Sequence, residues 1–323
     1  MKFCKSYENY MKQFGKKTLP GIGYRKLKKL INKCRTHNIQ SFDEAVISPP
    51  GCSVCDGNFF PSLFDEMLAV VDCFDKEAQK LLDPPLSCPW RIWVYFCFDC
   101  SKNEAKDHVL IKEGQELLIY AMFNAIAFRK ILKKYDKVHK CEKGREFKSG
   151  AQTKHIEVLQ SPWFYELMSF QINSRDRKLK ATSKDASLFE GLDLIFNNDN
   201  PSMSCELFDS FRIDVELICP ICLDIVFDAV ALRCGHILCY MCACSAASVN
   251  IVDGLKAATP NQKCPLCREV RVYGDATRLE ELNILLSKRC PEYWGKRLES
   301  ERVERLRLVK EHWQSQLHGL MTV

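Results

Sequence analysis

The sequence has no apolar run long enough to cross a membrane. Its most apolar stretch, 90–100, is about half of the roughly 18 residues that a membrane span needs, and Arg91 lies within it. The opening MKFCKSYENYMKQFGKK has no apolar segment behind its basic residues, so it does not read as a secretory signal. We therefore expect a soluble, intracellular chain that is not secreted. Its 19 cysteines should then be reduced, and clustered cysteines favour metal ligands over disulfides.

Acidic residues are scarce at the start of the chain. From 1 to 40 there are eleven Lys or Arg and one acid, Glu8, and a second basic stretch covers 129–154. The net charge of the whole chain is +6. Such blocks favour an anionic partner, either nucleic acid, an acidic membrane surface or a polyphosphate. A solvated surface without a partner is the alternative.

Apolar residues near a 3.6-residue period predict helices in the first half of the chain. The predicted helices cover 9–14, 25–34, 59–82 and 114–140. Pro20 and Gly21 break the chain between the first two. We expect these helices to form a mainly α bundle over 1–172.

The second half divides differently. The stretch 173–212 is polar and mixed, which predicts a linker with little helix or strand. A cysteine-rich domain at 213–272 follows, and a helical extension is expected at 273–323.

Cysteines recur in closely spaced pairs between 219 and 267. Three pairs have the C-x-x-C spacing that places two thiolates around one metal ion, and a fourth pair joins a cysteine to a histidine. The eight candidate ligands are Cys219, Cys222, Cys234, His236, Cys239, Cys242, Cys264 and Cys267. Four ligands fill a tetrahedral zinc site, so eight predict two zinc ions. A zinc-stabilised scaffold that only binds partners, or a nucleic-acid-binding zinc module, remains an alternative.

The order of seven cysteines with a histidine in fourth place resembles the RING finger family, whose members are small zinc-stabilised α+β domains. The resemblance implies that the pairs interleave. Cys219, Cys222, Cys239 and Cys242 would hold one zinc ion, and Cys234, His236, Cys264 and Cys267 would hold the other. Interleaving ties the ends of a domain that is too small to fold on its own core. Cys244 is left over and is expected to be a packed thiol.

RING ligases dock a ubiquitin-conjugating enzyme in a shallow apolar groove and form no covalent bond with ubiquitin. They hold the thioester-linked ubiquitin in a reactive geometry. The resemblance assigns the groove to Ile221, Pro265 and Leu266. It assigns Arg268 to a bridge between the conjugating enzyme and ubiquitin, for which a planar guanidinium is suited. An exposed surface charge at Arg268 and a core position for Ile221 are the alternatives.

Four lysines lie on one face of the helix predicted at 114–140. They follow i, i+3, i+4 and i+7 spacing at Lys130, Lys133, Lys134 and Lys137. Like charges at this spacing repel by a few tenths of a kcal/mol per pair, and an anion would relieve the repulsion. Periodicity alone leaves a solvated lysine face equally open.

The segments MKF at the start, YRKLKK near 25 and FRKILKKYDK near 130 resemble an SPX domain. That family is a helical bundle whose basic surface binds inositol polyphosphates, including pyrophosphates. The resemblance assigns phosphate contacts to Lys2, Tyr24, Lys28 and Lys133, and a neighbouring cluster to Lys130, Lys134 and Lys137. Ammonium groups with a tyrosine hydroxyl suit such a ligand. Nucleic acid fits less well, because no aromatic residues are interleaved as in single-strand binders.

An SPX region followed by a RING closely resembles the plant ubiquitin ligases of the nitrogen limitation adaptation type, over most of the chain. Further matching segments are CSVCDG near 52, LQSPW near 159, CYMCACSAASVN at 239–250 and LEELNILL at 279–286. The resemblance implies that the chain ubiquitinates plasma-membrane phosphate transporters, or nitrate transporters in some members. It also implies a cytoplasmic protein peripherally associated with the plasma membrane, with the nucleus as a further compartment. A non-enzymatic adaptor that binds an inositol phosphate is the runner-up, and a nucleic-acid binder is third.

Two regions are less determined by the sequence. Three prolines between 84 and 89 break a helix, so the geometry of 83–106 is left open. The pairs Cys52/Cys55 and Cys97/Cys100 are expected to be reduced, packed thiols rather than a third zinc site.

The tail from 296 to 317 has apolar residues near a heptad spacing. They are Val303, Leu306, Val309, Trp313 and Leu317. The run is shorter than the three to four heptads that indicate a coiled coil. A plain amphipathic helix is therefore the default, with capping of the RING or homodimer formation as the alternatives.

Overall fold

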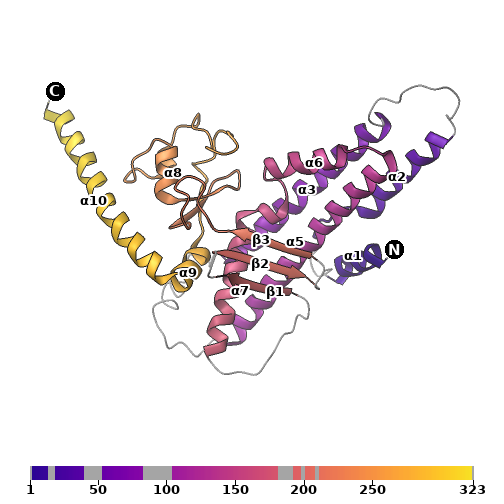
Figure 1. The fold of residues 1–323 in the computed structure, drawn as a ribbon, viewed down its shortest axis with the longest axis horizontal. Coiled ribbons are helices and arrows are strands. Elements are labelled where there is room, and N and C mark those ends of the chain that lie inside the picture. The colour runs from indigo at the N-terminus through magenta and orange to yellow at the C-terminus, as the bar shows by residue number, and fades with distance from the viewer. Residues whose placement is uncertain are drawn as a thin grey trace. The chain divides into compact units, whose positions relative to one another are not determined.

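The computed structural model describes residues 2–13, 19–39, 53–82, 104–180, 192–197, 201–207 and 211–321 (Figure 1). The chain forms two compact units, Met1–Phe164 and Tyr165–Val323. No helix among the described residues has both the length and the apolarity to cross a bilayer. The predictions for Cys52, Cys97 and Cys100, for the Cys55 side chain and for most of 83–106 lie outside the described residues.

The first unit is built from helices. They are α1 (Lys2–Gln13), α2 (Tyr24–Ile39), α3 (Ser53–Leu82), α5 (Glu104–His139), α6 (Lys143–Thr153), the short 3-10 helix η1 (Val158–Gln160) and the start of α7 (Pro162–Lys180). This confirms the predicted helix-rich N-terminal region, although the observed helices begin earlier than predicted. Helix α5 contacts α1, α2, α3 and α6. Residues 117–125 of α5 are all buried, as expected of a helix covered on every side.

Helix α3 buries one stripe at helical spacing. Its members are no more than 5% exposed: Phe59, Leu63, Met67, Val70, Phe74, Ala78 and Leu82. Leu68, the neighbour of the buried Met67, is also apolar but is 42% exposed. Where two apolar residues are adjacent, the period alone does not decide which of them faces the core.

A buried asparagine fixes the turn between α1 and α2. The side-chain oxygen of Asn124 accepts hydrogen bonds from the Tyr7 hydroxyl at 2.7 Å and from the backbone N–H of Ile22 at 3.0 Å. Asn124 is 1% exposed, so these bonds satisfy a polar group that water does not reach. A Cβ at Gly21 would lie 2.8 Å from the Tyr7 hydroxyl oxygen, so the close approach requires glycine. The turn sets the start of α2, which carries two of the predicted phosphate-binding residues.

The second unit holds the rest of α7, two small antiparallel sheets and the C-terminal helices. The first sheet has the order β1 (Leu192–Asn197), β2 (Ser202–Leu207) and β3 (Phe211–Glu216). The second has the order β5 (Ile237–Cys239), β4 (Ala229–Ala231) and β6 (Thr277–Arg278). The helices are α8 (Tyr240–Ala246), the 3-10 helix η2 (Leu255–Ala257), α9 (Glu280–Arg289) and α10 (Pro291–Met321). The predicted combination of an α+β cysteine-rich region with C-terminal helices is confirmed.

The prediction that 173–212 contains little helix or strand was wrong. Helix α7 continues to Lys180, and β1 and β2 lie in this range, with Leu194 opposite Cys205. Buried residues such as Cys205 alternate with polar ones, so the composition resembles a linker while one face packs. The domain limits themselves remain predictions.

Helix α9 is fixed to the part of α7 that lies in the second unit. The side-chain oxygens of the buried Glu166 accept hydrogen bonds from the backbone N–H groups of Glu281, at 2.6 Å, and Leu282, at 3.2 Å. These groups lie in the first turn of α9, where helical N–H groups lack partners within the helix. Asn173 donates to the Glu281 carbonyl at 2.9 Å. The cysteine-rich region is therefore followed by a helix whose start is held by α7.

Candidate functional site

Two groups of four ligands form in the second unit. Within each group the ligand atoms all lie within 4.8 Å of one another. The first group is Cys219, Cys222, Cys239 and Cys242, and the second is Cys234, His236, Cys264 and Cys267. The structure thus brings together the interleaved sets that the RING resemblance implied. Each set supplies four soft or borderline donors, which fit one zinc ion.

The distances within the groups suit tetrahedral coordination. Two sulfurs bound to one zinc at about 2.3 Å lie roughly 3.8 Å apart, and a sulfur and a nitrogen lie slightly closer. The Sγ atoms of Cys222 and Cys239 are 3.7 Å apart. His236 Nδ1 lies 3.4 Å from Cys234 Sγ and 3.7 Å from Cys264 Sγ. Nδ1 is therefore the histidine nitrogen positioned as the ligand.

Two of the ligand pairs share one backbone geometry. The N–H of Leu223 donates to the Cys219 carbonyl at 2.9 Å, and the N–H of Arg268 donates to the Cys264 carbonyl at 3.0 Å. Both residues follow the second cysteine of their pair, and both have positive φ, +60° for Leu223 and +61° for Arg268. This left-handed turn is costly for residues other than glycine. The same tight turn folds both C-x-x-C segments around a metal position.

The other ligands come from the small sheet and its helix. Cys234 and His236 lie in the loop between β4 and β5, Cys239 ends β5, and Cys242 lies in the first turn of α8. Cys239 Sγ also accepts a hydrogen bond from the Phe227 N–H at 3.3 Å. Strand pairing between β4 and β5 therefore places ligands of both groups close in space.

The thiols interact strongly enough to shift their titration. Hydrogen bonding from Cys234 lowers the pKa of Cys264. Hydrogen bonding from Cys239, and to a smaller extent from Cys242, lowers the pKa of Cys219. Thiolate is the form of cysteine that binds zinc. Cys244, the predicted spare thiol, is 3% exposed and belongs to neither group.

The predicted docking residues all lie at the surface. Ile221 is 40% exposed and Leu266 is 43% exposed, while Pro265 and Arg268 are also exposed. Ile221 is therefore not the core residue of the alternative interpretation. The sequence reasoning overlooked Leu223, which is 76% exposed. Its position directly after a C-x-x-C pair, matching that of Arg268, was the available signal.

The predicted phosphate-binding lysines occupy the surface of the first unit. Lys130, Lys133 and Lys137 are exposed on α5, and Lys134 is half-buried. Their opposite face, which includes Phe128 and Leu132, is buried in the bundle, as the periodicity predicts.

An aromatic residue that the sequence reasoning passed over joins two of the predicted phosphate-binding positions. The Lys130 ammonium lies 4.2 Å from the centre of the Phe3 ring, and the Tyr24 ring meets Phe3 edge-on at 5.8 Å. The structure therefore brings α1, the start of α2 and the lysine face of α5 together. Lys28 is half-buried on α2, and Lys2 is the first residue of α1, although its side chain is not described.

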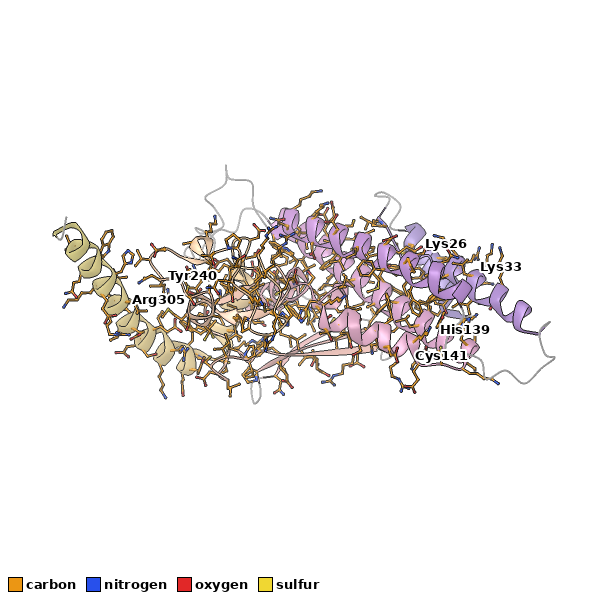
Figure 2. All side chains as sticks on the ribbon, turned by 90° about the horizontal axis from the view of Figure 1, so that it is seen from above. Lys26, Lys33, His139, Cys141, Tyr240 and Arg305 are labelled. Carbon is orange, nitrogen blue, oxygen red and sulfur yellow. The ribbon has the colours of Figure 1, made fainter. Side chains whose placement is uncertain are left out.

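Other lysines of α2 line a cavity between α1 and α2. Lys26, Lys29 and Lys33 line it together with Tyr7 and Tyr24, and Figure 2 labels Lys26 and Lys33. Lys26 is engaged by Glu66, at 3.5 Å, so its charge is partly neutralised.

Comparison with known protein families identifies the metal-binding region as a RING finger. The family model "Zinc finger, C3HC4 type (RING finger)" matches residues 219–267, which begin and end on ligand cysteines. No solved structure matches the chain.

Other known proteins are similar to this chain over nearly its whole length. The chain is 53% identical over 325 residues to a probable E3 ubiquitin-protein ligase BAH1-like 1 of Oryza sativa subsp. indica, covering 99% of both proteins. It is 49% identical over 329 residues to the E3 ubiquitin-protein ligase NLA of Arabidopsis thaliana, covering 98% of both. A probable E3 ubiquitin-protein ligase BAH1-like of Arabidopsis thaliana is 36% identical over 332 residues. The chain therefore belongs to the NLA and BAH1-like family of plant E3 ubiquitin-protein ligases, which are RING-type ubiquitin transferases.

Proposed function

We propose that this chain transfers ubiquitin by docking a ubiquitin-conjugating enzyme on the surface formed by Ile221, Pro265, Leu266 and Arg268. The observation that carries the proposal is the exposure of Ile221 and Leu266, each lying between the two cysteines of a C-x-x-C pair. The two side chains are 40% and 43% exposed, and removing this apolar surface from water would favour binding of a partner. The zinc ions give this surface its shape and take no part in the bond changes.

Arg268 would act by positioning. Its guanidinium offers several N–H donors in one plane, so it can bond the conjugating enzyme and ubiquitin at the same time. Fixing ubiquitin against the conjugating enzyme restricts the thioester to orientations that an acceptor lysine can attack. The thioester bond breaks, an isopeptide bond forms, and the conjugating enzyme regains its thiol, so no covalent intermediate with the RING is needed.

The test is a reconstitution with purified, zinc-loaded chain, ubiquitin, an activating enzyme and a panel of conjugating enzymes. Formation of ubiquitin chains with at least one conjugating enzyme supports the proposal. An absence of transfer across the panel, with two zinc ions bound, would contradict the proposal and favour the non-enzymatic adaptor hypothesis.

We further propose that the first unit binds an inositol polyphosphate or pyrophosphate through Lys2, Tyr24, Lys28 and Lys133, flanked by Lys130, Lys134 and Lys137. The grouping of Tyr24 and Lys130 around Phe3 supports this. Phosphate oxygens accept charge-assisted hydrogen bonds from ammonium groups, which are among the stronger hydrogen bonds in proteins. Calorimetry with inositol hexakisphosphate and with a pyrophosphate derivative tests the site.

The proposed substrates are plasma-membrane phosphate transporters, with nitrate transporters as a further class, so the chain would act in phosphate and nitrogen homeostasis. Support comes from the resemblance to the nitrogen limitation adaptation type. The chain would then work in the cytoplasm and at the plasma membrane, with the nucleus as a further compartment. Ubiquitination of a transporter in vesicles, with and without inositol polyphosphate, tests both the substrate and the regulation. Formation of a homodimer is a separate proposal, which does not depend on ubiquitin transfer or on inositol polyphosphate binding.

A further inference from the structure

One face of α10 packs on the RING. The rings of Trp294 and Phe227 lie 4.4 Å apart, and the Tyr293 hydroxyl donates to the Ile225 carbonyl at 2.7 Å. Further along, Arg305 bonds Asp228 at 2.8 Å. The orientation of α10 about its own axis is therefore fixed within the second unit.

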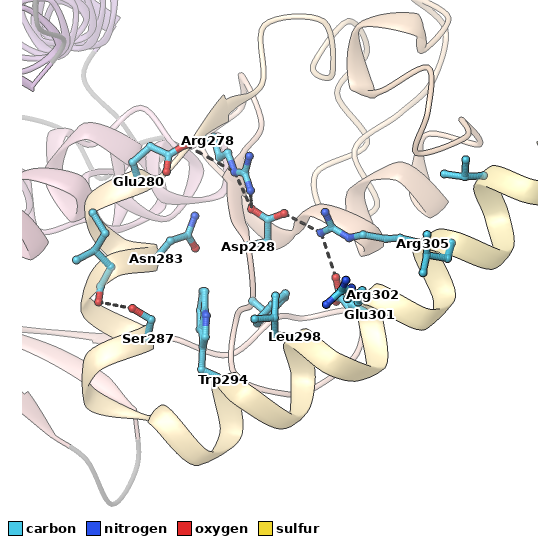
Figure 3. Close-up of a pocket in the computed structure, with 14 residues that line it drawn as sticks. Asp228, Arg278, Glu280, Asn283, Ser287, Trp294, Leu298, Glu301, Arg302 and Arg305 are labelled. Carbon is cyan, nitrogen blue, oxygen red and sulfur yellow. Dashed lines mark hydrogen bonds and ion pairs between the residues drawn. The ribbon is translucent and has the colours of Figure 1, made fainter. Parts of the chain in front are cut away.

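Fixing that orientation leaves an apolar surface uncovered. A cavity of about 640 Å³ lies between α9 and α10, and its lining includes Phe227, Ile284, Trp294 and Leu298. Figure 3 shows Trp294 and Leu298 projecting from α10 into this space, opposite Asn283 and Ser287 of α9.

The uncovered apolar surface continues along α10. We call it the α10 seam and define it as Leu298, Arg302, Leu306, Val309, Trp313 and Leu317. Successive members are four, four, three, four and four residues apart, so they lie on one face of the helix. Leu298, Leu306, Trp313 and Leu317 are 55%, 64%, 56% and 54% exposed. A row of large apolar side chains exposed to this degree marks an interaction surface.

The spacing of the seam reads the same in both directions. A second copy of α10 laid antiparallel would place Leu298 on Leu317 of the partner subunit, and Leu306 on Val309 of the partner subunit. Arg302 would then meet Trp313 of the partner subunit. A guanidinium over an indole ring is a favourable cation–π pair.

The charge of Arg302 favours antiparallel over parallel pairing of two α10 helices. In a parallel pair Arg302 would face Arg302 of the partner subunit, and burying two like charges together is unfavourable. The antiparallel pair removes this repulsion and also makes the same patch complementary to itself, as a two-fold interface requires. We propose that two copies of this chain form a homodimer through antiparallel pairing of their α10 seams, with Leu317 of each copy entering the cavity beside Trp294 of the other.

The first test measures the mass of the zinc-loaded, full-length chain by light scattering and sedimentation equilibrium. We expect a dimer at about 10 μM protein, and Leu306→Glu should raise its dissociation constant by roughly tenfold or more, as for a central apolar interface residue. Ile195→Glu is the matched control, because Ile195 is 56% exposed but lies on β1. Circular dichroism and zinc content establish that both variants are folded.

The second test determines whether the two α10 helices pair antiparallel or parallel. A benzophenone amino acid replaces Leu317 in a mixture of 14N- and 15N-labelled chains, and isotopically mixed crosslinks are mapped by mass spectrometry. Crosslinks to the segment around Leu298 support the antiparallel pair, and crosslinks around position 317 overturn it. A monomeric wild type, or an equal effect of Leu306→Glu and Ile195→Glu, overturns the interface. Neither readout depends on ubiquitin transfer.

Discussion

The carboxylate of Asp228 accepts a hydrogen bond from the Arg305 guanidinium at 2.8 Å, and this bond ties α10 to the RING. Asp228 is 5% exposed and also accepts a hydrogen bond from Arg278 Nε at 2.7 Å. Its φ of +50° lies in the left-handed region, which Asp and Asn tolerate better than most residues.

Asp228→Asn should therefore destabilise the second unit without adding backbone strain. The two carboxylate oxygens accept from different arginines, and Asn keeps one accepting oxygen while its NH2 group can only donate, so one hydrogen bond is lost and the other loses its anionic acceptor. We expect a loss of about 2–3 kcal/mol in the free energy of unfolding. Denaturant titration of the zinc-loaded chain measures it. Arg307→Ala is the control: its pairs with Glu304 and Glu311 are exposed, so the change should stay within about 0.5 kcal/mol.

Loss of one zinc ligand should unfold the RING. A structural zinc contributes on the order of 10–16 kcal/mol, more than a domain of this size has to spare. We expect the wild type to bind two zinc ions per chain by elemental analysis and Cys222→Ala to bind fewer. Cys244→Ala should keep both, because this buried thiol lies outside the two ligand groups. Full zinc content in Cys222→Ala would refute the assignment.

The docking surface predicts a specific loss of ubiquitin transfer. Ile221→Ala removes an exposed apolar side chain, so the chain should stay folded while discharge of ubiquitin from the conjugating enzyme slows by roughly tenfold. A gel-based single-turnover assay follows the discharge. Ile195→Ala makes the same substitution at an exposed position of β1 and should leave the rate unchanged. Equal rates for all three proteins would exclude this surface.

Binding of inositol hexakisphosphate should depend on the lysine face of α5. Lys133→Ala removes one ammonium donor, which should weaken binding roughly tenfold, because a hydrogen bond to a charged group is worth about 1.5–3 kcal/mol. Isothermal titration calorimetry measures the affinity. Lys76→Ala serves as the control, since Lys76 is an exposed lysine of α3 that pairs with Asp72 at 2.6 Å. Equal weakening by both would indicate attraction by net charge alone.

The stability of the second unit should fall as pH rises from about 4.5 to 8. Burial raises the pKa of Glu166 to about 8 from the usual 4.5, so the folded state holds a proton that the unfolded state has released. The stability linked to this proton is complete below pH 4.5 and is lost as the pH approaches 8. The slope approaches about 1.4 kcal/mol per pH unit. Glu166→Gln does not titrate and should flatten the slope in denaturant titrations; an unchanged slope would assign it to another group.

The zinc ligands were predictable because coordination imposes a short, fixed spacing within each pair. The first and last ligands are far apart in sequence, yet their order alone matched a known interleaved arrangement. The helices of the first unit were predictable because α3 and α5 carry long runs at helical period.

Long-range contacts were not predictable in the same way. The sheet β1–β2–β3 depends on pairing between strands whose polar residues resemble a linker. The Glu166 bond to the start of α9 spans 115 residues, and neither partner has a local signal of the other. Phe3 likewise gains its role only when α1, α2 and α5 meet.

The bond between Glu166 and the first turn of α9 has a practical consequence for dividing the protein. A fragment that starts at 213, the predicted edge of the RING, would lack α7 and most of the first sheet. It would leave the opening N–H groups of α9 without their acceptor, and it would leave the remainder of β3 without its partner strand β2. The shortest C-terminal fragment that keeps Glu166 together with α9 therefore starts near Tyr165, well upstream of the zinc ligands.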